Sequence, residues 1–134
     1  MITGNTRVYS IVVVDGSSEY RGSLLELLAY IPGIRVVAAG ANEIDAVALC
    51  ALHEPDILLI DSGIPAYGAL SSTRAVKARS PGMCIVLMTS DDVRDFTMLH
   101  RMTPADRIIS KSDIKSSILD ILSDLDRDAA RSAH

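Results

Sequence analysis

Five short apolar runs, each followed by a polar break and then by a stretch with helical spacing, constrain the fold of this chain most strongly. They occupy residues 8–14, 34–39, 56–60, 83–88 and 107–110. The runs are rich in Val and Ile, and their apolar residues are continuous rather than alternating with polar ones. This pattern is typical of β-strands that are buried on both faces. We therefore predict five strands of a parallel sheet.

The stretches that follow the runs carry apolar residues at the spacing of an amphipathic helix. The clearest stripe follows the last run and consists of Ile114, Ile118, Ile121, Leu122 and Leu125. Two shorter stripes consist of Leu24, Leu27, Leu28 and Ile31, and of Ile44, Val47, Ala48 and Ala51. Residues 70–79 and 93–102 have a weaker periodicity but are long enough to form helices. We predict one helix in each of these five stretches.

Repeated alternation of strand and helix favours a parallel sheet with helices on both faces. Because crossover connections are right-handed, few topologies remain. We expect an α/β fold, a flavodoxin-like (βα)5 doubly wound sheet with strand order 2-1-3-4-5. The length of 134 residues suits one domain. We place this domain at residues 7–125 and interpret residues 126–134 as a polar tail or the start of a linker.

The composition excludes several classes of protein. With 49% hydrophobic and 22% charged residues, the chain is not disordered, and its apolar runs are too short to span a membrane. The net charge is −4, and the sequence has no basic block and only five aromatic residues. It therefore lacks the positive charge and the stacking side chains that bind nucleic acid. The start of the sequence has no apolar secretory segment, and the two cysteines give neither a disulfide framework nor a metal spacing. We expect a cytoplasmic protein.

Polar residues that directly follow four of the predicted strands indicate a candidate site. Asp15, Asp61, Thr89 and Lys111 follow the first, third, fourth and fifth strands. These strands are neighbours in the expected order, and ligands bind such sheets at the carboxyl ends of the strands. Two carboxylates, a hydroxyl and an ammonium suit phosphoryl chemistry, with one carboxylate as nucleophile and another as a ligand of Mg²⁺.

Each of these residues also has an ordinary structural explanation. Asp15 could cap the helix that follows it, and Asp61 could belong to a turn. Thr89 could simply end a strand, and Lys111 could be a solvated loop side chain. The joint placement of all four at strand ends favours the functional interpretation.

Three segments resemble the receiver domains of response regulators, in particular those of the NarL/FixJ type. They are DILLIDSGIP around Asp61, VLMTS around Thr89 and IISK, which ends at Lys111. The resemblance covers residues 7 to 125. It implies that Asp61 accepts a phosphoryl group from a histidine kinase and that Thr89 and Lys111 contact this group. It also implies a Mg²⁺ site formed by Asp15, Asp61 and the backbone carbonyl of Gly63.

Two positions depart from the pattern of that family. Gly16 stands where the family usually has a second acidic residue, the one that touches the metal directly, so we expect Mg²⁺ to bind weakly. Ile108 stands where the family usually has a Tyr or Phe that moves inward on phosphorylation, and isoleucine has no such ring. We therefore predict an atypical receiver, in which Asp61 is phosphorylated weakly or not at all.

The predicted function is that of a two-component signal-transduction receiver domain without enzymatic activity, which regulates an attached or separate transcriptional output. Its expected partners are a histidine kinase or another signalling protein, and a second copy of the chain through the fourth helix, fifth strand and fifth helix. We expect this domain to contact neither nucleic acid nor membrane. The alternative is a flavodoxin-like flavin- or nucleotide-binding protein, because Gly16, Ser17 and Ser18 precede a helix and could cradle a phosphate.

Overall fold

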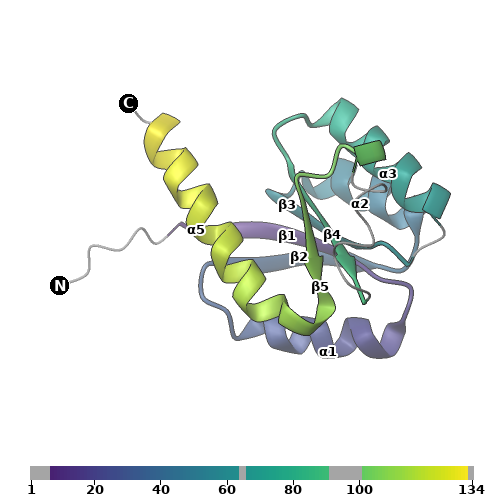
Figure 1. Cartoon of the computed structure of the whole chain (residues 1–134), viewed down its shortest axis with the longest axis horizontal. Coiled ribbons are helices and arrows are strands. Elements are labelled where there is room, and N and C mark those ends of the chain that lie inside the picture. Colours follow the sequence, from purple (N-terminus) through teal and green to yellow (C-terminus); the bar gives the residue numbers. More distant parts are fainter. Residues whose placement is uncertain (1–6, 64–65, 91–100, 133–134) are drawn as a thin grey trace.

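The computed structural model describes residues 7–63, 66–90 and 101–132. Within these ranges the chain forms one five-stranded sheet with the order β2-β1-β3-β4-β5, and every pair of neighbouring strands is parallel (Figure 1). The strands are β1 (Tyr9–Val14), β2 (Ile34–Gly40), β3 (Ile57–Asp61), β4 (Cys84–Thr89) and β5 (Arg107–Ser110). The five predicted strands and their order are therefore confirmed.

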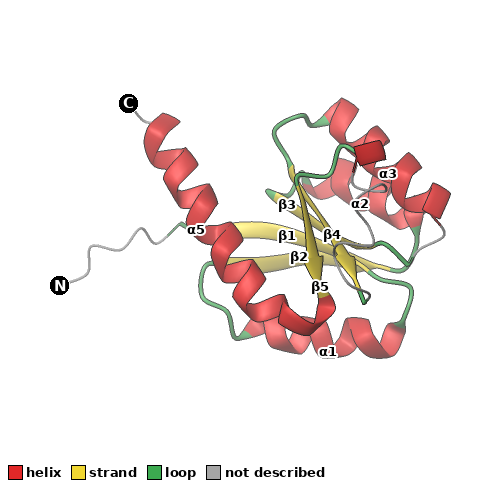
Figure 2. Ribbon diagram, in the orientation of Figure 1, coloured by secondary structure: helices red, strands yellow, loops and turns green. Residues whose placement is uncertain are grey.

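Helices cover both faces of the sheet. Figure 2 shows α1 and α5 on one face and α2 and α3 on the other. Their bounds are α1 (Ser18–Ala29), α2 (Glu43–His53), α3 (Ala66–Arg79) and α5 (Ile114–Ser132), and the 3₁₀ turn η2 (Lys111–Asp113) precedes α5. No helix in the ranges that the structure describes is long and apolar enough to cross a membrane.

Two of the expected helices differ from the sequence-based bounds. The helix expected at residues 70–79 begins earlier, at Ala66. Most of the helix expected at residues 93–102 lies outside the described residues, as does the corresponding part of the predicted dimer surface; Arg101 and Met102 are helical.

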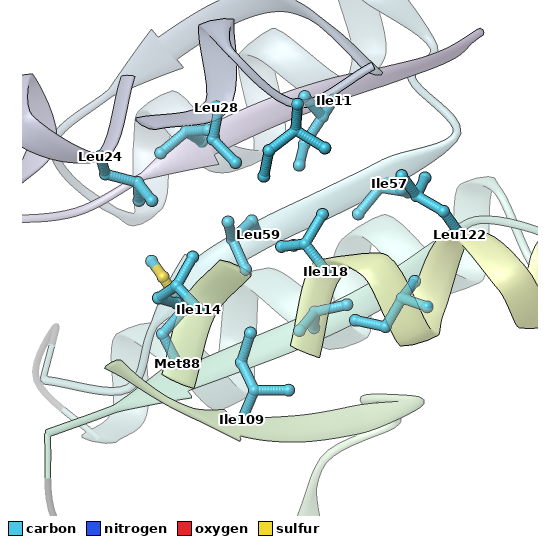
Figure 3. Packing of buried hydrophobic residues seen from close by; sticks show 14 of the residues in the cluster. Ile11, Leu24, Leu28, Ile57, Leu59, Met88, Ile109, Ile114, Ile118 and Leu122 are labelled. Carbon is cyan, nitrogen blue, oxygen red and sulfur yellow. The ribbon is translucent and has the colours of Figure 1, made fainter. Parts of the chain in front are cut away.

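The apolar runs of β1, β3 and β4 are buried because the sheet lies between two layers of helices, whereas the runs of the edge strands β2 and β5 are mostly half-buried or exposed. All five residues of the central strand β3 are buried. On one face, Ile11 and Leu59 of the sheet pack with Leu28 of α1 and Ile118 of α5 (Figure 3). Full burial of one such side chain is worth about 1.5–3 kcal/mol relative to its exposure. A second cluster on the other face packs under α2 and α3.

Helix α5 continues beyond Leu125, where the apolar stripe ends, as far as Ser132. This part of the helix is linked to the start of the sheet, because the Tyr9 hydroxyl donates a 2.8 Å hydrogen bond to Oδ1 of Asp126. Burial raises the pKa of Tyr9 to about 12, and the hydrogen bond to Asp126 contributes to this increase. Residues 126–132 are thus helical, which leaves open whether they form a tail or the start of a linker.

The raised pKa predicts how the link between Tyr9 and α5 responds to alkali. Because the folded value of about 12 exceeds the ordinary value of 10.0, the stabilisation is complete below pH 10 and is lost as the pH rises to about 12. We expect Tyr9→Phe to lower the free energy of unfolding at neutral pH by about 1 kcal/mol. The variant should also lose less stability than the unmodified protein between pH 10 and 12, as measured by urea unfolding.

Tyr30→Phe is the matched control, because the Tyr30 side chain is 86% exposed. It should change neither the neutral nor the alkaline stability. If the free energy of unfolding falls equally between pH 10 and 12 in Tyr9→Phe and in the unmodified protein, the link between Tyr9 and Asp126 is contradicted.

Candidate functional site

The carboxyl edge of the sheet positions all four residues expected at the site. Asp15 directly follows β1, Asp61 is the last residue of β3, Thr89 is the last residue of β4, and Lys111 directly follows β5. Asp15, Asp61 and Lys111 are in direct contact. Thr89 is buried at the neighbouring strand end, where it is paired in register with Ser110.

The centre of the site is the ammonium group of Lys111. Its Nζ lies 2.8 Å from Oδ2 of Asp15 and 3.1 Å from Oδ1 of Asp61. The Asp15 side chain is fully buried, whereas 12% of the Asp61 side chain and 15% of the Lys111 side chain are exposed. Burial by itself would lower the pKa of Lys111, but its hydrogen bonds to Asp15 and Asp61 outweigh burial and raise it. Lys111 is therefore a cation at neutral pH, and it balances one of the two negative charges.

Asp15 combines the two roles that its sequence position left open. Its Oδ2 accepts from Lys111, and its Oδ1 accepts a 2.8 Å hydrogen bond from the backbone N–H of Ser17. Ser17 is the N-cap of α1, and its hydroxyl oxygen accepts from the backbone N–H of Tyr20 at 3.1 Å. Asp15 thus stabilises the turn into α1 and supplies a carboxylate to the site.

Asp61 likewise belongs both to the site and to a turn. Its Oδ1 accepts a 3.1 Å hydrogen bond from the backbone N–H of Gly63 as well as the contact from Lys111. A Cβ atom at position 63 would lie 3.1 Å from Oδ2 of Asp61, which is tighter than an ordinary contact. A glycine at this position therefore leaves the Asp61 carboxylate room at the edge of the sheet.

Two site residues were not indicated by the sequence pattern. The Tyr20 ring lies over Lys111, with Nζ 4.2 Å from the ring centroid, and Nη1 of Arg21 donates a 2.6 Å hydrogen bond to the backbone carbonyl of Asp15. Burial raises the pKa of Tyr20, while the charge of Lys111 acts in the opposite direction. The only signal in the sequence is that both residues lie in the helix that follows Asp15.

The position of Gly16 has space for a side chain. A Cβ atom there would meet only the carbonyl oxygen of Ala41, at an ordinary contact distance of 3.8 Å. The second carboxylate of the expected metal site is therefore missing because of the residue type and not because of crowding. Among the described residues, no three His, Cys, Asp or Glu side chains gather to hold a metal. Asp15, Asp61 and the Gly63 carbonyl remain a donor set that suits Mg²⁺ only weakly.

Ile108 lies within β5, directly opposite Leu87 of β4. It is half-buried and packs against the hydrophobic cluster beneath α2 and α3. Its contacts are those of a core side chain at the edge of the sheet.

The relatives found by comparison include a transcriptional regulatory protein and a response regulator. No family model matches the chain. The chain is 28% identical over 88 residues to the transcriptional regulatory protein DegU of Brevibacillus brevis, a match that covers 66% of this chain and 37% of DegU. It is 29% identical over 80 residues to the response regulator UvrY of Escherichia coli K12, with 60% and 37% covered. The chain thus spans little more than a third of the length of these two relatives.

The solved structures with a similar fold include a response regulator and a receiver domain. A two-component response regulator of the LuxR family from Aurantimonas sp. SI85-9A1 has a TM-score of 0.77 at 24% identity, covering 87% of this chain and 86% of that chain. The signal receiver domain of NarL from Mycobacterium tuberculosis has a TM-score of 0.74 at 20% identity, covering 87% and 98%. The chain folds as a response-regulator receiver domain. A flavin- or nucleotide-binding function finds no support among these proteins.

The contacts of this candidate site predict a large effect of removing its cation. Lys111→Met would leave the buried carboxylates of Asp15 and Asp61 side by side without compensation, so we expect the free energy of unfolding to fall by about 3 kcal/mol. Lys115→Met, at an exposed position of the adjoining helix, is the control and should change it by less than about 0.5 kcal/mol.

Chemical denaturation at neutral pH measures both variants. Asp15→Asn in the Lys111→Met background should recover part of the loss, because one of the two facing charges is then removed. Equal stability of Lys111→Met and Lys115→Met would contradict this account of the site.

Proposed function

We propose that this chain is the receiver module of a two-component signalling protein, with Asp61 at the phosphoryl-acceptor position and with weak or absent phosphorylation. The observation that carries the proposal is that Lys111 contacts both Asp15 and Asp61 at the carboxyl edge of a receiver fold, while Gly16 adds no second carboxylate. The module then acts mainly by binding other proteins.

Each residue at the carboxyl edge of the sheet has a separate role in the proposed phosphorylation of Asp61. The Asp61 carboxylate would attack the phosphorus of a phosphohistidine on the kinase, and the bond to the histidine nitrogen would break. Lys111 would leave Asp61 to pair with the phosphoryl oxygens, and the Thr89 hydroxyl would donate to one of them. Asp15, Asp61 and the Gly63 carbonyl would hold Mg²⁺, which supplies positive charge against the repulsion between the phosphoryl group and the carboxylate.

Two residues support weak phosphorylation. Each carboxylate offsets part of the cost of dehydrating Mg²⁺, so a site with Gly16 binds the ion less tightly than one with a second acid. Ile108 is branched at Cβ and packs, half-buried, against the core, and it carries no aromatic ring that could change position when Thr89 engages a phosphoryl group. Signal transmission by an inward-moving ring is thus not available to this chain.

The proposed partners follow from the relatives. One neighbour by structure is CheY6 of R. sphaeroides in complex with the P1 domain of CheA3, and another is the response regulator RcsB in complex with DNA. We propose a histidine kinase or another signalling protein upstream and a transcriptional output downstream, with no contact between this acidic domain and DNA. A dimer through the fourth helix, β5 and α5 remains part of the proposal.

The receiver itself is proposed to be non-enzymatic. The chain is 38% identical over 83 residues to protein-glutamate methylesterase/protein-glutamine glutaminase 1 of Pseudomonas fluorescens, but the match spans 24% of that enzyme. Cys50 and Cys84 are free thiols, which is consistent with the proposed cytoplasmic location.

Phosphorylation can be measured by incubating the protein with Mg²⁺ and acetyl phosphate and weighing it by intact mass spectrometry. We expect only a small fraction of the chains to gain the mass of one phosphoryl group, because the metal site is one carboxylate short. Asp61→Asn should abolish that fraction. Complete modification that disappears in Asp61→Asn would refute weak phosphorylation, and modification that persists in Asp61→Asn would refute Asp61 as the acceptor.

The missing ligand can be restored. Gly16→Asp should raise the affinity for Mg²⁺ in a calorimetric titration by about tenfold or more, since even groups outside the first coordination sphere contribute about that much. Gly82→Asp adds the same charge at an exposed glycine with open space around it, just before β4 and so away from the carboxyl edge, and should leave the affinity unchanged. If both variants bind Mg²⁺ like the unmodified protein, the explanation based on Gly16 is wrong.

A further inference from the structure

We propose that Tyr20 is a positioning residue that holds the Lys111 ammonium on Asp15 and Asp61, so that an internal cation is bound to these two carboxylates. The inference rests on the proposed receiver function in one respect, because it takes these two carboxylates as the functional pair. The contacts that carry it are geometric and do not depend on phosphorylation.

Three side chains contact the Lys111 ammonium group, which has three N–H donors. Two point to Asp15 at 2.8 Å and to Asp61 at 3.1 Å, and the Tyr20 ring covers a third side at 4.2 Å from its centroid. A cation within about 6 Å of a ring centroid is attracted to the ring face, and the attraction grows as water is removed. Only 15% of the Lys111 side chain is exposed, so little water competes with these contacts.

The position of the ring is set by the same turn that orients Asp15. Oδ1 of Asp15 accepts from the backbone N–H of Ser17, and the Ser17 hydroxyl oxygen accepts from the backbone N–H of Tyr20. The ring then contacts Lys111, and Lys111 donates to Oδ2 of Asp15. These contacts form a closed circuit of four residues. In addition, Tyr20 packs against the core cluster between the sheet, α1 and α5, which limits its movement.

This circuit also affects any external cation that approaches Asp15 and Asp61. A lysine side chain has a flexible four-carbon stem and normally samples many rotamers. Here the ring stabilises the one arrangement in which the ammonium lies on both carboxylates. A metal ion must therefore displace Lys111 or share the carboxylates with it. Tyr20 and Gly16 both weaken the binding of a metal ion at Asp15 and Asp61. Tyr20 holds the Lys111 ammonium on these carboxylates, and Gly16 provides no carboxylate to the metal ion.

The ordinary alternative is that Tyr20 only fills space at the start of α1. Lys111 also lines a groove of about 530 Å³ between α1 and α5, together with Tyr20, Leu27 and Leu119. This groove gives a small reagent access to the lysine, so the chemical reactivity of Lys111 reports how tightly its ammonium is held. Because Tyr20 lines the same groove, a purely space-filling role predicts that an apolar side chain of similar length, as in Tyr20→Met, leaves the reactivity of Lys111 unchanged.

The test is brief acylation of amines at neutral pH with a small water-soluble reagent, followed by peptide mass spectrometry. The chain has two other lysines as internal references, Lys77 and Lys115. We expect Tyr20→Leu, which keeps an apolar side chain but removes the ring, to raise the labelling rate of Lys111 about threefold to tenfold. Tyr20→Phe keeps the ring and should stay within about twofold of the unmodified protein. Should the Leu variant fail to fold, Tyr20→Met provides the same comparison.

Two outcomes would overturn the inference. Either Lys111 is labelled at the same rate in Tyr20→Leu and in the unmodified protein, or all three lysines become more reactive together, which would indicate general loosening of the fold. Because the assay contains neither Mg²⁺ nor a phosphoryl donor, its result is independent of the phosphorylation assay on Asp61. The proposed function and the role of Tyr20 can therefore fail separately.

Discussion

The ion pair network between Lys111, Asp15 and Asp61 is the interaction on which the carboxyl edge of the sheet depends. It joins the ends of β1, β3 and β5, and the strand between β3 and β5 contributes Thr89. Two carboxylates at a buried strand edge are tolerated because one ammonium lies within hydrogen-bonding distance of both. Lys111 supplies one positive charge for the two carboxylates, and Arg21 adds a second cation at the backbone carbonyl of Asp15.

At this edge the carboxylates of Asp15 and Asp61 bond both to backbone N–H groups of turns and to Lys111. Asp15 uses one oxygen for the turn into α1 and the other for Lys111, and Asp61 shares one oxygen between Lys111 and the turn at Gly63. Capping and function are therefore not competing explanations for these aspartates. A carboxylate whose orientation is set by a backbone N–H donor needs little reorganisation when a ligand arrives, which is a general advantage in binding sites.

The strands and the contact between Lys111 and the two aspartates were predictable because both follow from short-range rules. A continuous run of Val, Ile and Leu such as that in β3 predicts burial on both faces, and parallel strands bring their carboxyl ends to one edge. Helix α3 was harder to delimit, since its first turns carry small and polar residues. Ser72 and Thr73 are nevertheless accommodated within the helix because their hydroxyls donate to the carbonyls of Gly68 and Ala69, four residues earlier.

By itself, the sequence determined the alternation of strands and helices and the four polar residues at strand ends, because periodicity acts locally. Right-handed crossovers left only a few possible strand orders. Only the tertiary structure decided that Tyr20 covers Lys111 and that α5 extends to Ser132. The first contact joins residues 91 positions apart (from 20 to 111) on different elements. The second involves a polar segment that has no apolar stripe and is linked to the sheet by the hydrogen bond from Tyr9 to Asp126. Contacts of this kind leave no periodic signal, since they depend on which surfaces the completed sheet brings together.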